Sequence, residues 1–230
     1  MYINKSYRSE FKDVFEGYHL EIQVVNHCNL NCSGCNHFSP LAKKWFMPIE
    51  EFIENLILIK QKLPSIKELM ILGGEPTLHP QLAKLCLIAR TLFPDIIISI
   101  LTNGLVLQDW TFQQFEEIYS SNVSFCVSQY YEQDYGWLPE IKARYPGLLS
   151  LESKARFVFD SDLVNVDGTE NGKENFFSCS KHKLPCFTIK NKKIYICPFS
   201  AHIEHFCDRF NVSIPEHPSD YLDLTQDVVL

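Results

Sequence analysis

Short apolar runs alternate with longer amphipathic stretches along the first 160 residues of this 230-residue chain. The short runs are typical of buried strands, and the longer stretches carry apolar residues at helical spacing. The predicted strands are residues 20–25, 69–72, 96–101, 123–128 and 155–159. Because such alternation requires crossover connections, it predicts a parallel sheet in an α/β fold. Five or six strand–helix units fall short of a closed eight-unit barrel, so we expect a partial (β/α)5-6 TIM-like barrel.

Four helical patterns connect these strands. The first begins at Pro48, and the second begins at residues 79–80. The third carries Phe112, Phe115 and Ile118 on one face, with Asp109 as the expected N-cap. The fourth covers residues 139–145 and ends at a Pro-Gly pair.

Distinctive residues directly follow or end these predicted strands. A cysteine-rich loop follows the first strand, Gly73-Gly74-Glu75-Pro76 follows the second, and Thr102-Asn103-Gly104 follows the third. Ser128 ends the fourth strand. Chemistry in parallel α/β folds takes place at the carboxyl ends of the strands. We therefore expect one shared site at this edge of the sheet.

The cysteine loop holds Cys28, Cys32 and Cys35 in the spacing C-x3-C-x2-C. Three thiolates can bind three irons of a [4Fe–4S] cube and leave the fourth iron open, whereas an electron-transfer ferredoxin normally fills all four positions with cysteine. An open iron suits a site that binds a small molecule. Structural zinc sites also use four ligands, and His27 and His37 flank the trio. Zinc and chance clustering therefore remain alternatives.

The trio resembles the signature of the radical S-adenosylmethionine (radical SAM) superfamily. In that family S-adenosylmethionine occupies the open iron, and its reductive cleavage gives a 5′-deoxyadenosyl radical that abstracts a hydrogen atom from the substrate. The resemblance implies that Gly73-Gly74-Glu75-Pro76 contacts the cofactor's amino group and that Asn103 and Ser128 contact the cofactor. An ordinary turn and a surface serine are the alternatives for the last two. Gly34 replaces an aromatic residue common in the family, which leaves the adenine contact unassigned.

A second group of cysteines lies in the last quarter of the chain: Cys179, Cys186, Cys197 and Cys207. Two of them bracket a predicted hairpin around Asn191-Lys192, and a helix is predicted over residues 201–210. The arrangement is similar to the auxiliary modules called SPASM and Twitch, which implies a second iron–sulfur cluster. Those modules usually end in a further cysteine pair that does not occur here. A zinc site, an incomplete site in a fragment of a longer chain, and free thiols are the alternatives.

These patterns predict three regions. Residues 15–160 form the radical SAM core, residues 161–178 form a polar linker, and residues 179–230 form the SPASM/Twitch-like module.

Composition narrows the classes of partner. The net charge of −7 argues against nucleic acid and against a polybasic membrane contact. No apolar stretch approaches the ~20 residues that span a bilayer, and Met1 to Lys12 has no signal-peptide pattern. Nine cysteines without an export signal favour a reducing cytoplasm over a disulfide framework.

The leading hypothesis is a radical SAM enzyme that acts on a small molecule such as a sugar or an amino alcohol. An auxiliary cluster would allow an oxidation, and flavodoxin or ferredoxin would supply the electron. A peptide-modifying radical SAM enzyme is one alternative, and a non-catalytic iron–sulfur or metal-binding protein is another. The sequence assigns no general acid or base.

Overall fold

The computed structural model of the chain describes residues 17–63, 65–130, 134–155, 171–179 and 186–226, together with residues 164 and 169. Its strands are β1 (Tyr18–Val25), β2 (Ile66–Gly73), β3 (Ile97–Thr102), β4 (Ser124–Tyr130), β5 (Leu149–Ala155), β6 (Cys186–Lys190), β7 (Lys193–Tyr195) and β8 (Tyr221–Asp223). Its α-helices are α2 (Ile49–Lys62), α3 (Leu82–Leu92), α4 (Phe112–Ser120), α5 (Leu138–Arg144), α6 (Gly172–Ser178) and α7 (Pro198–Phe210). Two short 3-10 turns are η2 (Pro76–Leu78) and η3 (Val106–Asp109).

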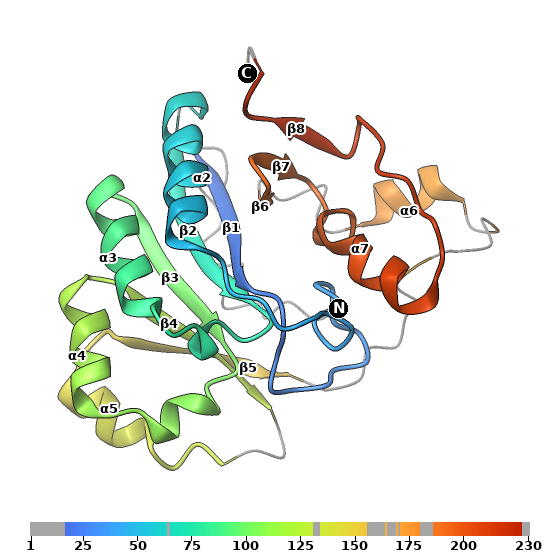
Figure 1. The fold of residues 1–230 in the computed structure, drawn as a ribbon. Coiled ribbons are helices and arrows are strands. Elements are labelled where there is room, and N and C mark those ends of the chain that lie inside the picture. Colours follow the sequence, from blue (N-terminus) through green and yellow to red (C-terminus); the bar gives the residue numbers. More distant parts are fainter. Residues whose placement is uncertain are drawn as a thin grey trace.

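The described strands form one open sheet in the order β5-β4-β3-β2-β1-β6-β7-β8. Neighbouring strands from β5 to β6 pair in parallel, and β7 and β8 add antiparallel pairs at one edge. Figure 1 shows α2, α3, α4 and α5 on the same side of the sheet. This arrangement confirms the predicted α/β class with a mostly parallel sheet that does not close.

The two faces of the central strand β1 differ in chemistry. Leu20, Ile22 and Val24 are fully buried and join the same apolar cluster as Phe52 and Leu56 of α2. The residues between them in β1 are polar and project to the opposite face, since successive side chains of a strand alternate. The helices therefore cover an apolar face, and a polar face is left on the other side of the sheet.

Strand register brings the predicted site residues to one edge. Val25, the last residue of β1, pairs with Gly73, the last residue of β2. Thr102 ends β3 and pairs with Val127 of β4. The cysteine loop, the Gly-Gly-Glu-Pro turn and the Thr-Asn-Gly turn thus leave the sheet side by side, as parallel pairing requires.

The predicted hairpin is confirmed, and it belongs to the main sheet. β6 pairs in parallel with β1, with Cys186 opposite His19. β6 and β7 pair antiparallel around Asn191 and Lys192, both of which have positive φ angles, of 51° and 63°. Two consecutive residues of this kind form the tight turn that matches the twist of a hairpin. The division into core, linker and module stays a prediction.

Some element boundaries differ from those predicted. The N-cap of α4 is Thr111, not Asp109, because Thr111 and Gln114 form a reciprocal capping box. The fifth strand was predicted over residues 155–159; β5 ends at Ala155, and residues 156–159 lie outside the described part of the chain. Helix α6 lies within the predicted linker, and β8 was not predicted.

The helices of the described residues include none that is long and apolar enough to cross a lipid bilayer.

Candidate functional site

The cysteine loop is pinned at both ends to the sheet. The backbone N–H of Asn26 donates to the carbonyl oxygen of Trp45 at 3.3 Å, and the N–H of Met47 donates to that of Val24 at 2.9 Å. Val25 and Phe46 also form an isolated bridge. The segment between these contacts is therefore a closed loop whose position is set by β1, and it carries all three cysteines of the trio.

Cys28, Cys32 and Cys35 are partly exposed and form no disulfide. The Cys28 sulfur accepts a hydrogen bond from the backbone N–H of Leu30 at 3.3 Å and a longer one from the side-chain amide of Asn103 at 3.8 Å. Burial raises the pKa of the Cys28 thiol to about 12. A bound cation would be needed to hold this sulfur as a thiolate near neutral pH.

Gly73 and Gly74 approach protein backbone at very short distance. A Cβ atom at Gly73 would lie 2.4 Å from the carbonyl oxygen of Val25, and one at Gly74 would lie 2.1 Å from that of His27. The N–H of Gly74 donates to Val25 at 2.7 Å, and the N–H of Glu75 donates to His27 at 3.1 Å. The glycines are thus explained by close packing of the turn against the cysteine loop, whereas sequence reasoning attributed them to the approach of a ligand.

Glu75 is fully buried, and internal partners surround its carboxylate. One oxygen accepts hydrogen bonds from the N–H and hydroxyl of Thr77, at 3.0 and 2.5 Å, and from the hydroxyl of Thr102 at 2.6 Å. The other accepts from the N–H of Asn103 at 2.9 Å. Burial raises the pKa of Glu75, and these four donors oppose that shift. The carboxylate therefore ties the end of β2 to the end of β3.

Asn103 links this network to the cysteine loop. Its side-chain amide donates to the Asn29 side-chain oxygen at 2.7 Å. The hydroxyl of Tyr135 donates to the Asn103 carbonyl oxygen at 2.9 Å and lies 3.5 Å from that of Ser128. The structure thus brings Asn103 together with the trio, and Ser128 adjoins them through Tyr135. Sequence reasoning missed Tyr135 because its position follows from the fold and not from a motif.

The segment after Pro76 is fixed by a buried histidine. The Nδ1 atom of His79 accepts a hydrogen bond from the N–H of Gln81 at 3.1 Å, and its Nε2 atom lies 3.1 Å from the carbonyl oxygen of Met47. An Nδ1 acceptor requires the neutral ring with its proton on Nε2. Burial lowers the pKa of His79 below 6.5, which favours that neutral form. His79 therefore joins the start of α3 to the end of the cysteine loop.

A row of buried polar side chains lies on the sheet face opposite the helices. Cys186 and Thr188 of β6 donate to the two carboxylate oxygens of Glu21, at 3.1 and 3.3 Å. His19 Nδ1 lies 2.9 Å from a carboxylate oxygen of Glu68. The apolar–polar alternation in β1 was the sequence signal for this face, although Cys186 was the one residue of the row that sequence reasoning named, as a candidate iron–sulfur ligand. Gln23 lies on the same face of β1, and its side-chain oxygen lies 2.5 Å from Nδ1 of His37, so the polar face reaches the segment that follows the trio.

Cys186 of the C-terminal cysteines lies far from the trio. Cys186 pairs with His19, six residues before the end of β1, which corresponds to about 20 Å along the strand. If the β6–β7 register is continued, Cys186 lies opposite Cys197. Cys207 lies ten residues after Cys197 near the far end of α7, a rise of about 15 Å. This separation weighs against Cys207 sharing one cluster with Cys197. Cys179 is exposed and directly follows α6.

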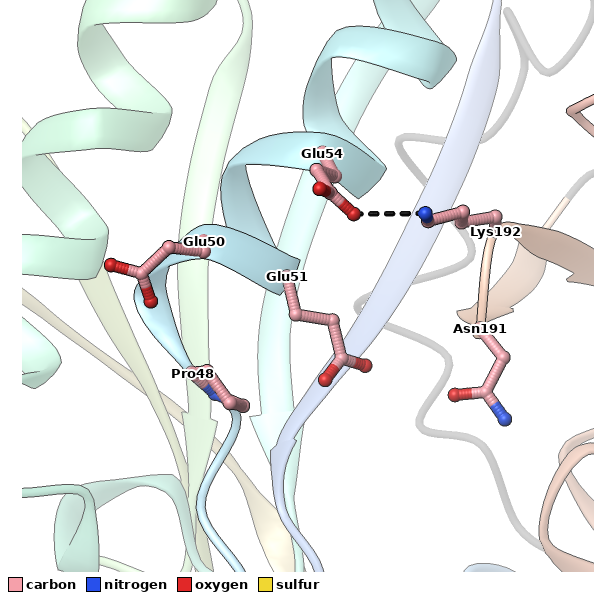
Figure 2. Close-up of a pocket in the computed structure, with 6 residues that line it drawn as sticks. All are labelled: Pro48, Glu50, Glu51, Glu54, Asn191 and Lys192. Carbon is pink, nitrogen blue, oxygen red and sulfur yellow. Dashed lines mark ion pairs between the residues drawn. The ribbon is translucent and has the colours of Figure 1, made fainter.

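A surface pocket of about 490 Å³ lies away from the predicted cofactor residues. Its lining is Pro48, Glu50, Glu51, Glu54, Asn191 and Lys192 (Figure 2). The carboxylate of Glu54 and the ammonium of Lys192 form an ion pair at 2.9 Å (Figure 2). This contact joins α2 to the β6–β7 turn, so a structural role accounts for it.

Residues 22–124 match the family model described as the Radical SAM superfamily. The chain is 29% identical over 90 residues to an S-adenosylmethionine-dependent nucleotide dehydratase from a Thermoplasmatales archaeon (strain ISO4-H5), covering 39% of this chain. It is 32% identical over 92 residues to 7,8-dihydro-6-hydroxymethylpterin dimethyltransferase of Methanocaldococcus jannaschii, covering 38%. It is 31% identical over 110 residues to the sporulation killing factor maturation protein SkfB of Bacillus subtilis (strain 168), covering 46%. The matches span 30%, 17% and 25% of those proteins.

Among solved structures, the fold is similar to that of BtrN in complex with AdoMet and 2-DOIA, with a TM-score of 0.53 and 14% identity. The match covers 86% of this chain and 83% of that one. The family model includes the cysteine trio, the Gly-Gly-Glu-Pro turn and Asn103 within its range. Residues 22–124 therefore form a domain of the radical SAM superfamily.

Proposed function

We propose that the chain is a radical SAM enzyme. Cys28, Cys32 and Cys35 would hold a [4Fe–4S] cluster, and S-adenosylmethionine would bind at its open iron. The proposal is carried by the direct contacts among the motifs at the sheet edge. Asn103 donates both to Asn29 of the cysteine loop and, through its backbone N–H, to Glu75. Three features that are far apart in sequence therefore share one site.

The donor set fits the proposed cluster. Three partly exposed cysteine thiols lie in one loop, and the backbone N–H of Leu30 donates to the Cys28 sulfur, a contact of the kind that stabilises a thiolate ligand. His37, one zinc-ligand alternative, instead places its Nδ1 atom within 2.5 Å of the Gln23 side-chain oxygen. That contact directs one of its ring nitrogens away from the trio. The bound cofactor would supply a carbon radical able to remove a hydrogen atom from an unactivated C–H bond.

The turn after β2 would position the cofactor rather than bind it through the Glu75 carboxylate. That carboxylate is fully buried and accepts four hydrogen bonds within the protein. We infer that backbone groups of Gly73 and Gly74 face the cofactor's amino group and that Glu75 holds their geometry. The family resemblance implied that the whole Gly-Gly-Glu-Pro segment contacts the amino group, and this inference limits that contact to the backbone.

The substrate is proposed to be a small polar molecule, with a sugar or an amino alcohol as specific candidates. The buried row that includes Glu21, Gln23 and Glu68 supports this class, since a hydrogen-bonding wall favours a substrate with several polar groups. Two relatives are named for nucleotide and pterin chemistry. A peptide substrate is the second candidate, because a third relative is named as a maturation protein.

An auxiliary iron–sulfur site is proposed at Cys186 and Cys197, with Cys179 as a further ligand. The β6–β7 register supports it, since the same register continued past Thr188 and Tyr195 would bring the first two opposite each other. Such a site would accept one electron from the substrate radical and so complete a two-electron oxidation, and an external flavodoxin or ferredoxin would reduce the first cluster. No disulfide joins any of the nine cysteines, all of which lie in the described part of the chain, and we propose a reducing, cytoplasmic setting.

The proposal is tested by anaerobic reconstitution with iron and sulfide. Reduced wild-type protein is expected to give a [4Fe–4S] electron paramagnetic resonance signal that changes when S-adenosylmethionine is added. The C32A variant is expected to lose the part of the signal that changes with S-adenosylmethionine, and the C126A variant, which removes a buried β4 thiol, is expected to keep it. A wild-type signal that S-adenosylmethionine leaves unchanged would refute the proposal and favour an electron-transfer protein.

A further inference from the structure

Three side chains of α7 form a cluster that the proposed function does not use. The helix spans Pro198–Phe210, and His202, Glu204 and His205 each present one ligand atom within 4.8 Å of the others. We propose that these residues bind a divalent metal ion of the zinc class, separate from the iron–sulfur sites. The proposal does not depend on radical chemistry.

Burial and hydrogen bonding carry the proposal. His202 is 1% exposed, and among the described residues no hydrogen bond reaches either of its ring nitrogens. The Nε2 atom of His205 is also buried without a hydrogen bond. Buried polar atoms normally have a hydrogen-bond partner, so buried ring nitrogens that lie close together without one indicate that a bound partner is missing. A metal ion accepts electron pairs from such nitrogens, and neutral imidazole is its commonest protein ligand.

The local backbone presents the two histidines on one side of α7. His202 departs from helical geometry, with φ −124° and ψ 15°, so the helix is kinked at the proposed ligand. The two rings stack with their centroids 6.2 Å apart. Residues three apart on a helix lie on one face, which is a common arrangement for a pair of metal-ligating side chains.

The third ligand is available at the edge of the cluster. A carboxylate oxygen of Glu204 lies 3.7 Å from Nε2 of His205, and the side chain is about half exposed. In this structure the same oxygen accepts a hydrogen bond from Lys190, which also donates to the carbonyl oxygen of Ala201 at 2.7 Å. Lys190 and Glu204 line a surface pocket of about 440 Å³. The lysine therefore has space to yield the carboxylate to a metal ion.

The cluster adjoins the cysteine loop. The ring of His37, two residues after Cys35, stacks on His202 with centroids 5.0 Å apart. His37 in turn lies within 2.5 Å of Gln23 on β1. A metal at His202 would therefore fix the contact between α7 and the loop that carries the trio. Two imidazoles and one carboxylate, with an open position, form a ligand set that suits Zn²⁺.

The test measures zinc on the full chain after anaerobic cluster reconstitution, so that the trio thiols are occupied. After dialysis against zinc chloride, wild-type protein is expected to retain one more zinc ion per chain than the H202Q or H205Q variant retains. The E204Q variant is expected to bind zinc more weakly by on the order of tenfold or more. The H217Q variant is the matched control, because His217 is exposed and lies outside α7.

X-ray absorption at the zinc edge separates this site from cysteine ligation. The proposal predicts nitrogen and oxygen ligands at about 2.0–2.1 Å and no sulfur at about 2.3 Å. Sulfur ligation, no zinc retained by wild type, or equal retention in H205Q and wild type would each overturn it. If circular dichroism shows that H202Q does not fold, H205Q decides the question, since His205 is less deeply buried than His202.

Discussion

Replacing Glu75 with glutamine tests whether its carboxylate is a structural link or a cofactor ligand. In E75Q one of the two backbone donors, from Thr77 or Asn103, would face the new amide N–H₂ group and lose its acceptor. An unsatisfied buried donor costs about 1–3 kcal/mol, and the remaining hydrogen bonds weaken because they no longer involve a charge. Removing a buried charge offsets part of this loss. We expect a net destabilisation of about 2 kcal/mol.

The assay is thermal unfolding without added cofactor. For a chain of this length, a loss of about 2 kcal/mol lowers the melting temperature by roughly 4–8 °C. The E116Q variant, at an exposed position of α4, is the control and is expected to change stability by less than about 0.5 kcal/mol. If E75Q is as stable as wild type but loses S-adenosylmethionine binding, the carboxylate contacts the cofactor and the inferred structural role is wrong.

Three further variants test other contacts of the site. G74A is expected to lower both the thermal stability and the iron content after reconstitution, because the new Cβ would lie 2.1 Å from a backbone carbonyl oxygen. G172A is the control and should behave as wild type, because a Cβ at Gly172 has no neighbouring atom within 4 Å. The His79 pKa is lowered on folding, so its stabilising effect is full above about pH 6.5 and is lost as pH falls through the folded pKa. The stability difference between wild type and H79Q, measured by urea unfolding, should therefore narrow from about pH 7.5 to about pH 5, and a constant difference would contradict this. Y135F removes the hydrogen bond from the Tyr135 hydroxyl to Asn103, so its free energy of unfolding should fall by about 1 kcal/mol and its binding of S-adenosylmethionine should weaken. An unchanged unfolding curve and an unchanged affinity by titration calorimetry would count against that contact.

Much of the fold followed from local patterns. The runs at residues 20–25, 69–72, 96–101 and 123–128 are strands because their apolar side chains pair with amphipathic helices, and the structure places strands over all four. Residues 149–154 of β5 were not predicted because Leu149 and Leu151 alternate with polar residues at the sheet edge, which is a weak signal. The sequence also contains the capping-box pair Thr111 and Gln114 at the start of α4, but Asp109 was predicted as the N-cap because aspartate has a stronger intrinsic N-cap preference than threonine.

The contacts within the candidate site could be predicted from the sequence only in part, because many of them join residues that are far apart in the chain. Motif spacing shows that Gly73 and Gly74 need close contact with something, but the sequence alone does not say whether that partner is a ligand or the Val25 and His27 carbonyl groups. The buried polar row around Glu21 depends on strands 165 residues apart in sequence, since Cys186 donates to it from β6. Long-range pairing of this kind leaves no local signature.

Cys28, Cys32 and Cys35 are proposed to support reductive cleavage of S-adenosylmethionine. The most direct measurement is anaerobic incubation of reconstituted, reduced protein with S-adenosylmethionine, followed by chromatographic detection of 5′-deoxyadenosine. Wild-type protein is expected to form 5′-deoxyadenosine, and C32A is expected to form none above the background of dithionite alone. Wild-type protein that carries a complete [4Fe–4S] cluster yet forms no 5′-deoxyadenosine would contradict the account.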